Sequence, residues 1–409
     1  MPPSNRTVHE TSANEIDLRS QWHAFCDRLK DGAEVALDPS RPGDETDRAE
    51  GIRALLRRIA NEVSRTLEGG GIHRPELAWI HPFKNGQDNP DALYQIAEID
   101  LSRTYRLSGS VGTVCYLGIT AMTTNFADAA IEQFLSLNGD DLSNKPHGEF
   151  ELIFGAGPTP EGTPAERFHK LPPRTCSLIV RQFFNDWEGE VPADLHLECL
   201  DPESGSARFD PGGLVSQILP LADRVVDMTA FWADFGQAHL ARQQVNSFDH
   251  VQAAPGATSH QGGSFDQGYG QTWYRIADDE ALLLEVDIPE CAYWGIQLGD
   301  VWYQSLDWWN HQSSLNGHQA ILGEDGFLRA VISHHDPHIA NWLDTTGSTQ
   351  GCITYRWNQA TSQPIPRCQL VPFAELADHL DDRWTRISRD ERHEALRKRR
   401  RGALRRFRR

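Results

Sequence analysis

Apolar side chains near the N-terminus recur close to helical spacing. Residues 16–30 carry a first stripe, Ile16, Trp22, Phe25, Cys26 and Leu29. After a break rich in Pro, Gly and Asp, a second stripe consists of Ile52, Leu55, Leu56, Ile59 and Val63. Such stripes are typical of amphipathic helices that cover a core. We therefore expect a helical region over residues 15–74, preceded by a polar, disordered stretch over residues 1–14.

From about residue 75 the apolar period changes to two. Short runs such as "LYQIAEIDL" and "GEFELIFG" are rich in β-branched and aromatic residues and end at turn-forming residues. They indicate antiparallel strands over residues 75–212. Residues 213–250 return to a helical pattern, in which Pro220 predicts a break or a kink. Strands reappear over residues 251–365, and charged helices with a basic tail are expected over residues 366–409.

The two strand blocks are bordered by helices and do not alternate strand with helix, as a parallel doubly wound sheet would. This order predicts a mainly β fold with flanking α-helices, of the antiparallel β-sandwich or jelly-roll type. No internal repeat is apparent in the sequence, which argues against propellers and solenoids.

The formal net charge is −19, and it is unevenly distributed. Residues 386–409 hold twelve Arg or Lys against three acidic residues, a local charge of +9, so the rest of the 409-residue chain carries −28. An acidic body disfavours nucleic acid as the main ligand. We expect the basic tail to be a solvated helix or a helix that docks on its own chain.

The cysteines and the N-terminal sequence favour a cytoplasmic location. Seven cysteines, an odd number with no CxxC pair, favour reduced thiols over a disulfide framework. The N-terminus does not resemble a signal peptide, and no apolar run approaches the roughly 18 residues of a membrane span. We expect a soluble, cytoplasmic protein without a membrane span; a homo-oligomer is left open.

Several signatures of known chemistry are missing from the sequence. It has no GxSxG elbow, no HExxH motif, no EF-hand loop, and no Rossmann or P-loop glycine pattern. A standard serine hydrolase, a zinc protease and a calcium protein are therefore disfavoured, and we expect no cofactor.

The stretch "SHHDPHIANWLDT", residues 333–345, concentrates three histidines, two aspartates and a tryptophan. In an extended backbone His334 and Asp336 point to one side and His335 to the other, so adjacent histidines do not face one ion. We therefore assign no metal ligand. An aspartate that bonds an imidazole can instead move protons, which Asp336 or Asp344 beside His334 would allow. The alternative is structural, because Asp before Pro and Asn before Trp are common in turns and caps.

Tryptophans are concentrated in the same region. The segment 291–358 holds six of the twelve: Trp294, Trp302, Trp308, Trp309, Trp342 and Trp357. Such a density indicates either a tryptophan-rich sandwich core or an aromatic-lined pocket for a flat or ring-bearing small molecule. The neighbouring run "LDWWNHQSSLNGHQ" adds His318 and Asn316 as polar candidates.

Residues 270–347 contain an ALxxE strand, a YWxxQL strand, an SxNxxQ element, a DG turn and an NWLDT element. In these motifs the chain resembles the family catalogued as domain of unknown function 1214. Residues 89–113 look like the upstream part of such proteins, and "ISRDERHEALRKRR" looks like their C-terminal helix. The matching residues are Ala281, Leu282, Glu285, Tyr293, Trp294, Gln297, Leu298, Ser314, Asn316, Gln319, Asp325, Gly326, Ile332, Ser333, Asp336, Pro337, Asn341, Trp342, Leu343, Asp344 and Thr345.

The resemblance implies a β-sandwich over residues 251–365 and a place among bacterial enzymes that handle steroids, lipids and other hydrophobic compounds. It implies no agreed reaction. His338 stands where the family usually has Gly, and His335 where a basic or acidic residue is common. These departures weaken a family-wide metal site, whereas Asp336, Asn341, Trp342 and Asp344 fit the shared pattern.

We therefore expect a small-molecule enzyme of steroid, lipid, terpenoid or aromatic metabolism that uses non-redox acid/base chemistry, as a hydrolase or a lyase. The candidate catalytic residues are Asp336 or Asp344 as base or histidine-orienting group, and His334 or His318 as proton carrier. The candidate substrate-binding residues are Asn316 and Asn341 for a polar oxygen, Trp309 and Trp342 for a ring system, and Tyr94 and Arg103 for the opposite wall or as a structural cluster.

The alternative belongs to another class of protein. An aromatic face of this kind also suits a noncatalytic carbohydrate- or lipid-binding module, or an accessory subunit of an enzyme.

Overall fold

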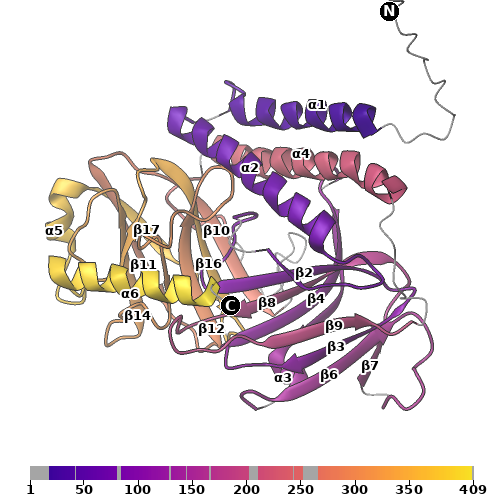
Figure 1. Ribbon diagram of the computed structural model, residues 1–409. Coiled ribbons are helices and arrows are strands. Elements are labelled where there is room, and N and C mark those ends of the chain that lie inside the picture. The colour runs from indigo at the N-terminus through magenta and orange to yellow at the C-terminus, as the bar shows by residue number, and fades with distance from the viewer. Residues whose placement is uncertain are drawn as a thin grey trace, which may run out of the picture.

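The computed structural model describes residues 18–41, 43–80, 84–128, 130–143, 145–164, 167–201, 211–242, 244–251 and 266–407. The stretch 1–14, expected to be disordered, lies outside the described residues. The fold is mainly β with flanking helices, as the sequence predicts: two β-sandwiches stand side by side under a layer of helices, and one further helix lies along the C-terminal side (Figure 1).

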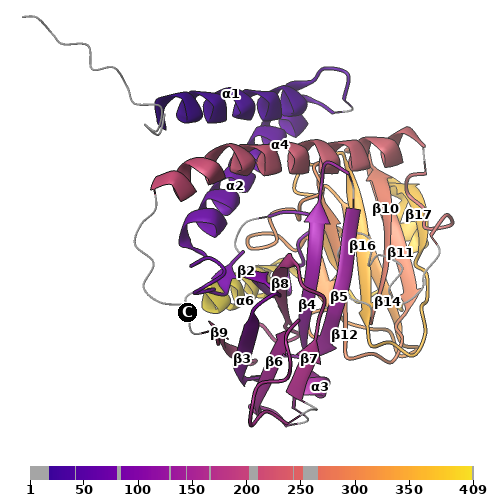
Figure 2. The ribbon, with the colours of Figure 1, turned by 90° about the vertical axis from the view of Figure 1, so that its right-hand side faces the viewer.

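The helical layer consists of α1 (Leu18–Leu37), α2 (Glu45–Glu68) and α4 (Pro211–Ala241). Asp44 starts α2 with a capping box, in which its side chain accepts the N–H of Asp47 and the Asp47 carboxylate accepts the N–H of Asp44. The helices pack against one another through Phe25, Leu55 and Val225. Of the predicted stripes, Trp22 and Leu56 are exposed, and Ile16 lies outside the described residues. Helix α4 continues through Pro220, so that proline does not break it. Figure 2 shows α4 running over both sandwiches.

The first sandwich is formed by sheet A, with strand order β1-β2-β8-β4-β5, and sheet B, with order β7-β6-β3-β9. Their alternating apolar residues meet in a core that contains Leu107, Ile119, Phe154 and Leu178. The elements are β1 (Ala78–Trp79), β2 (Ala92–Asp100), β3 (Thr104–Ser110), β4 (Tyr116–Asn125), β5 (Ala130–Asn138), α3 (Gly139–Leu142), β6 (Glu149–Gly155), β7 (Phe168–Lys170), β8 (Thr175–Phe183) and β9 (Asp194–Cys199).

The second sandwich is formed by sheet C, with order β10-β16-β12-β13, and sheet D, with order β15-β14-β11-β17. Its core includes Leu284, Ile296, Ile332 and Tyr355. Residues 367–372 form a strand of this sandwich, so the second β region extends past residue 365 into the segment that the sequence assigned to helices. The strands are β10 (Gln267–Arg275), β11 (Glu280–Asp287), β12 (Tyr293–Gly299), β13 (Ser314–Asn316), β14 (Phe327–Ser333), β15 (Trp342–Asp344), β16 (Gln350–Asn358) and β17 (Arg367–Pro372).

The two sandwiches are an internal repeat. Every strand from β2 to β9 has a counterpart eight strands later in the same sheet position, including the parallel pairs β6·β7 and β14·β15. The absence of a repeat inferred from the sequence is therefore wrong. The shared residues are few and scattered: DxxY at 91–94 and 266–269, YxGI at 116–119 and 293–296, and SLNG at 136–139 and 314–317.

The strand register shows that these matching residues occupy equivalent positions in the two sandwiches. Asn138 pairs with Gly118 in sheet A, and Asn316 pairs with Gly295 in sheet C. Both asparagine side chains accept the backbone N–H groups two and three residues further on. The same residue thus performs the same turn-forming role in each half.

Sheets A and C contact each other through a reciprocal exchange of hydrogen bonds. The Tyr116 hydroxyl of the first sandwich donates to Asp266 of the second over 2.9 Å, and the Tyr293 hydroxyl of the second donates to Asp91 of the first over 2.7 Å. The DxxY and YxGI repeats therefore supply the two sides of the contact between the sandwiches.

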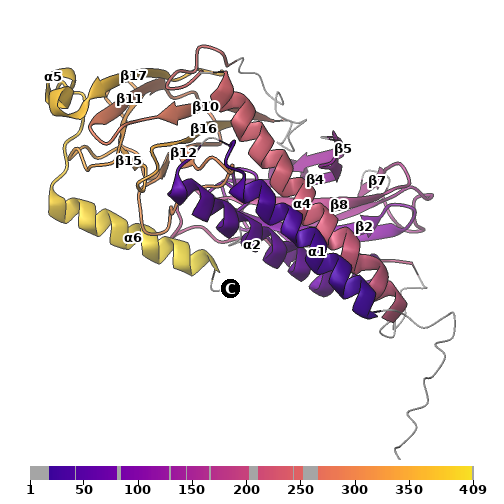
Figure 3. The ribbon, with the colours of Figure 1, turned by 90° about the horizontal axis from the view of Figure 1, so that it is seen from above.

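The C-terminal segment contains η3 (Phe373–Glu375), α5 (Leu376–His379) and α6 (Arg389–Phe407). Helix α6 lies along the second sandwich (Figure 3), reaches Trp187 of the first with its C-terminal half, and buries Arg392, Arg399 and Arg406. Residues seven apart share one face of a helix, so this face carries a row of arginines. The basic tail thus docks on its own chain. Among the described residues, no helix has the length and apolar character that a membrane crossing requires.

Candidate functional site

The segment 333–345 turns away from the sheet and returns to it. Strand β14 ends at Ser333, and β15 comes back parallel to β14, with Trp342 beside Val331 and Asp344 beside Ser333. The polar residues between these strands lie on a loop against α6. His335 and His338 are exposed on this loop.

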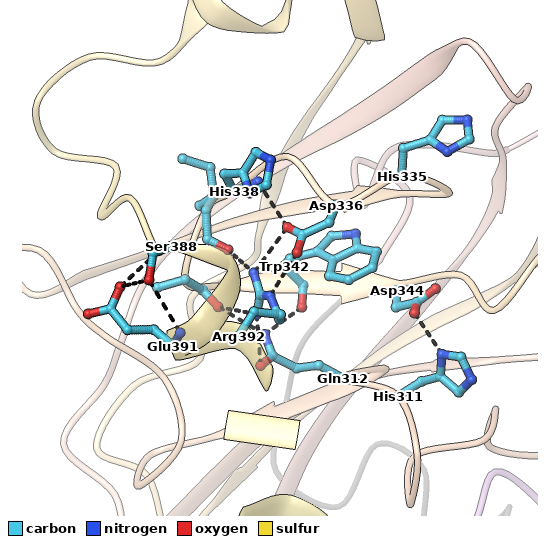
Figure 4. A network of polar contacts seen from close by, with 12 residues as sticks. His311, Gln312, His335, Asp336, His338, Trp342, Asp344, Ser388, Glu391 and Arg392 are labelled. Carbon is cyan, nitrogen blue, oxygen red and sulfur yellow. Dashed lines mark hydrogen bonds and ion pairs between the residues drawn. The ribbon is translucent and has the colours of Figure 1, made fainter. Parts of the chain in front are cut away.

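Asp336 is held by the buried arginine of α6. Its carboxylate accepts from Arg392 Nε over 3.1 Å and from the His338 backbone N–H over 2.9 Å (Figure 4). Arg392 also donates to Gln312 and lies over the ring of Trp342 at 5.2 Å. Asp336 therefore neutralises a guanidinium that is 3% exposed, which is a structural task.

Both ring nitrogens of His334 are engaged in the fold. Its Nε2 lies 3.1 Å from the Ile276 carbonyl oxygen, and its Nδ1 lies 2.7 Å from the Thr345 hydroxyl. Because a carbonyl only accepts, Nε2 carries the proton and Nδ1 accepts from Thr345. In this arrangement His334 has no free nitrogen for a substrate. No cluster of three metal-binding side chains occurs among the residues that the structure describes.

Asp344 does meet an imidazole, but that of His311. His311 Nδ1 lies 2.8 Å from Asp344 Oδ2, and Figure 4 shows the pair apart from the Arg392 cluster. The His311 side chain is 44% exposed, whereas that of Asp344 is 12% exposed. The carboxylate can thus orient a histidine, but this is neither His334 nor His318, the two candidates from the sequence, and His311 lines none of the cavities described below.

The two asparagines of the predicted site fix loops. Asn316 is fully buried and donates to Asp91 over 2.7 Å and to two backbone carbonyls. Asn341 exchanges hydrogen bonds with the backbone of Ile321 and donates to the Arg329 carbonyl. Their amides are therefore occupied by protein groups.

The tryptophans mostly belong to the interior. Trp294, Trp302, Trp308, Trp342 and Trp357 are buried, which fits the tryptophan-rich core rather than an open aromatic pocket. Trp342 donates its indole N–H to the Ser333 carbonyl. Trp309 is half-buried and stacks on Phe407 of α6, with ring centroids 5.1 Å apart.

Tyr94 and Arg103 do not join the other candidates. Tyr94 stands on β2 opposite Arg181, in the contact region between the two sandwiches. Arg103 follows β2 and lies 3.6 Å from the Asp201 carboxylate, within the first sandwich. The structural alternative given for these two residues matches their surroundings.

His318 is a candidate that faces a cavity. A hollow of about 160 Å³ lies between residues 186–188, the turn after β13 and one face of α6. Among its lining residues are Asp186, His318, Gln319, Lys398 and Arg399. His318 Nε2 lies 3.7 Å from Asp186 Oδ1, and the imidazole is 41% exposed. We call this hollow the His318 cavity.

The charges around the His318 cavity favour an ionised carboxylate beside the imidazole. Burial works to raise the pKa of Asp186, but the backbone N–H groups of Glu188 and Gly189 and the charges of His318 and Lys398 outweigh it and lower that pKa. Arg399 is held by the Trp308 and Ser314 carbonyls and by Gln319. Lys398 is exposed and has no hydrogen bond to a described residue.

The sequence pointed to His318 but not to its partners. Asp186 belongs to a turn after β8 in the first sandwich, and Lys398 belongs to α6. The heptad spacing of arginines in "RHEALRKRRRGALRRF" is the one signal that reveals which face of α6 is buried and hence where Lys398 lies.

Comparisons with solved structures include a strong likeness. The structure of an uncharacterised protein from Burkholderia cenocepacia shares 32% identity and a TM-score of 0.79, over 87% of this chain and 97% of that one. A protein of Vibrio parahaemolyticus gives 11% identity and a TM-score of 0.43, over 83% and 99%. No family model and no curated protein matches the sequence, so the resemblance to domain of unknown function 1214 stays a prediction.

Proposed function

The chain belongs to the same family as the uncharacterised Burkholderia cenocepacia protein, and we propose that it is an enzyme that acts on small molecules by non-redox acid/base chemistry. The reaction is a hydrolysis or an elimination. His318 carries the proton, and Asp186 stabilises the charged imidazolium. Asp336 and His334, first considered for these roles, serve the fold in this proposal.

One observation carries the proposal: an exposed imidazole stands in a cavity 3.7 Å from a carboxylate whose pKa is lowered. Histidine changes its charge near neutral pH, so it can take and return a proton within one reaction cycle. His318 is free to do so, because its ring makes no hydrogen bond to any described residue.

The cavity also limits the substrate. Its basic wall, Lys398 and Arg399, suits a carbonyl, carboxylate or phosphate oxygen on the reacting group. A volume of about 160 Å³ is below the range that usually encloses a whole ligand, so only the reacting end enters. The remainder of a steroid, lipid, terpenoid or aromatic substrate would lie outside.

The location proposed is the cytoplasm. All seven cysteines are free thiols, including two buried ones, which supports a reducing compartment.

The test is a metabolite comparison by mass spectrometry, in which the purified protein is incubated with a bacterial cell extract. We expect the wild type to convert at least one compound and His318→Asn to lose about 100-fold or more of that rate. The matched control is Asp140→Asn, because Asp140 occupies the equivalent position in the first sandwich and should leave the rate unchanged.

Two outcomes reject the proposal. If His318→Asn converts the compound as fast as the wild type, His318 is not the proton carrier. If compounds are retained by the protein but none is converted, the noncatalytic binding module replaces the enzyme. The variant Asp336→Asn should be less stable than the wild type but keep its turnover per folded molecule. If it loses turnover without losing stability, Asp336 is a catalytic residue after all.

A further inference from the structure

A larger cavity lies between the first sandwich and the helical layer. It has a volume of about 410 Å³ and is bounded by sheet A and by helices α2 and α4. Figure 2 shows these helices above the strands of sheet A. Its floor consists of side chains that point away from the sandwich core, among them Ile96, Met122 and Ile179. We call it the sheet A cavity.

Comparison of the two repeats shows that the space beside sheet A is open, whereas the equivalent space beside sheet C is filled. Glu98 pairs with Ser177 in sheet A, and the equivalent pair in sheet C is Trp273 with Cys352. Trp273 is fully buried and packs with Trp302 and Tyr303 against α4. The second sandwich thus fills with aromatic rings the space that the first keeps as a cavity.

The ceiling of the sheet A cavity has an excess of positive charge at one end. Glu62 is 2% exposed, and its Oε2 accepts from Arg65 over 2.9 Å and from Arg224 over 3.0 Å. Two guanidinium groups therefore share one carboxylate. Arg65 Nε is also buried without a hydrogen-bond partner among the described residues, so a donor remains for an incoming acceptor.

The other acidic groups do not cancel this charge. Asp227 at the rim is already bonded to Arg28 of α1 over 3.0 Å. Glu98 is exposed on β2, at the sheet side of the cavity rather than in the ceiling. A ligand carboxylate at Arg65 would thus meet an arginine pair that is only half neutralised.

We propose that the sheet A cavity binds a small carboxylic acid with an apolar body. The carboxylate lies at Arg65 and Arg224, and the apolar body lies on Ile96, Met122 and Ile179. The binding energy comes from burial of the apolar part and from charge-assisted hydrogen bonds to the arginines. This site is separate from the His318 cavity and does not depend on the proposed enzymatic function.

Calorimetric titration of the full-length protein with octanoate and octanamide tests the proposal. The two probes have the same apolar chain and differ in charge. We expect octanoate to bind about tenfold or more tightly than octanamide, the size of a charge-assisted hydrogen bond. The variant Arg65→Gln should remove that preference, because Glu62 keeps Arg224 as its partner. Arg103→Gln, an arginine elsewhere in the same sandwich, should leave it unchanged.

A second variant tests the space itself. Glu98→Trp places in sheet A the residue that fills the equivalent position of sheet C, and it should weaken the binding of both probes about tenfold or more while circular dichroism stays native. Unaltered octanoate binding in Glu98→Trp, equal binding of the two probes to the wild type, or no binding of octanoate would each overturn the proposal. If Glu98→Trp does not fold, the Arg65→Gln comparison decides alone.

Discussion

Asp300 is a buried carboxyl group that the sequence does not single out. Its burial destabilises the ionised form of the side chain. Asp300 is buried directly after β12, and it accepts hydrogen bonds from the backbone N–H groups of Trp302 and Gln304 and from the Gln304 side chain. Burial raises its pKa to about 7, against the opposing effects of these hydrogen bonds and of Lys84. A buried carboxylate without a salt bridge costs free energy as soon as it ionises.

This raised pKa predicts a loss of stability with rising pH. The unfolded chain releases the Asp300 proton near pH 4, but the folded chain holds it to about pH 7. The folded state therefore binds more protons across that window, and its stability falls as pH rises, by up to about 1.4 kcal/mol per pH unit. Urea unfolding of wild type and Asp300→Asn between about pH 5 and pH 7.5 checks this.

The variant Asp300→Asn should show a shallower decline than the wild type, because asparagine does not titrate. Asp307→Asn is the control: this carboxyl lies close by in the sequence on an exposed residue, and its pKa is lowered, so it does not titrate in this range. Equal slopes in the wild type and in Asp300→Asn would refute the assignment.

At the level of single residues, the sequence identified chemical types but not partners. Asp336, Asn316 and Asn341 were singled out as polar groups near tryptophans, and each is engaged in hydrogen bonds. Their partners lie 56, 225 and 12 residues away. Whether a buried carboxylate faces a substrate or an arginine depends on such distant contacts, which spacing along a strand does not determine.

Local periodicity predicts most of the helices and strands, but it predicts the C-terminal elements β17 and α6 less well. The apolar stripes of α1 and α2 and the alternating strands follow directly from spacing. Strand β17 was missed because "RCQLVP" is short and mostly exposed, at the edge of sheet D. Helix α6 has few apolar residues, and its buried face is a row of arginines, so a hydrophobic pattern does not reveal its docking.

The docking of α6 rests on these arginines, and Arg399 is the central one. Its guanidinium donates to the Trp308 carbonyl over 2.6 Å, to the Ser314 carbonyl and hydroxyl, and to Gln319. Arg399→Lys keeps a positive charge but replaces the planar group by one nitrogen. We expect it to lower the free energy of unfolding by about 2 to 4 kcal/mol, because several buried acceptors lose their donors.

Chemical denaturation measures this loss, with Arg397→Lys as the control. Arg397 stands on the outer face of α6, its side chain is 66% exposed, and its contact is with Glu394 of the same helix. Its replacement should change the stability by no more than about 0.5 kcal/mol. Similar effects of the two variants would mean that α6 is held by general charge attraction rather than by the Arg399 geometry.

At the scale of the whole molecule, the sandwich class follows from the sequence but the duplication does not. Alternating apolar residues specify two-layered β-structure in each half. The repeat is hidden because the residues that the halves share serve the contact between the sandwiches and the turn after one strand. Core positions have changed independently, since any combination of apolar side chains of suitable volume fills a core.

The reciprocal tyrosine contacts should therefore make the two sandwiches unfold together. In the variant Tyr116→Phe/Tyr293→Phe, Asp91 and Asp266 each lose a hydroxyl donor, which costs about 2 to 5 kcal/mol in total. Differential scanning calorimetry should then give a calorimetric enthalpy larger than the van't Hoff enthalpy, because the sandwiches separate into two transitions.

The matched control is Tyr274→Phe/Tyr355→Phe. These two hydroxyls are buried in the second sandwich without a hydrogen-bond partner among the described residues, so their removal should cost little or raise stability. The contrast between the two double variants isolates the exchange across the interface from the mere loss of two buried hydroxyls. A single transition with an unchanged midpoint in Tyr116→Phe/Tyr293→Phe would show that other contacts, such as helices α4 and α6, which both touch the two sandwiches, couple them without the tyrosines.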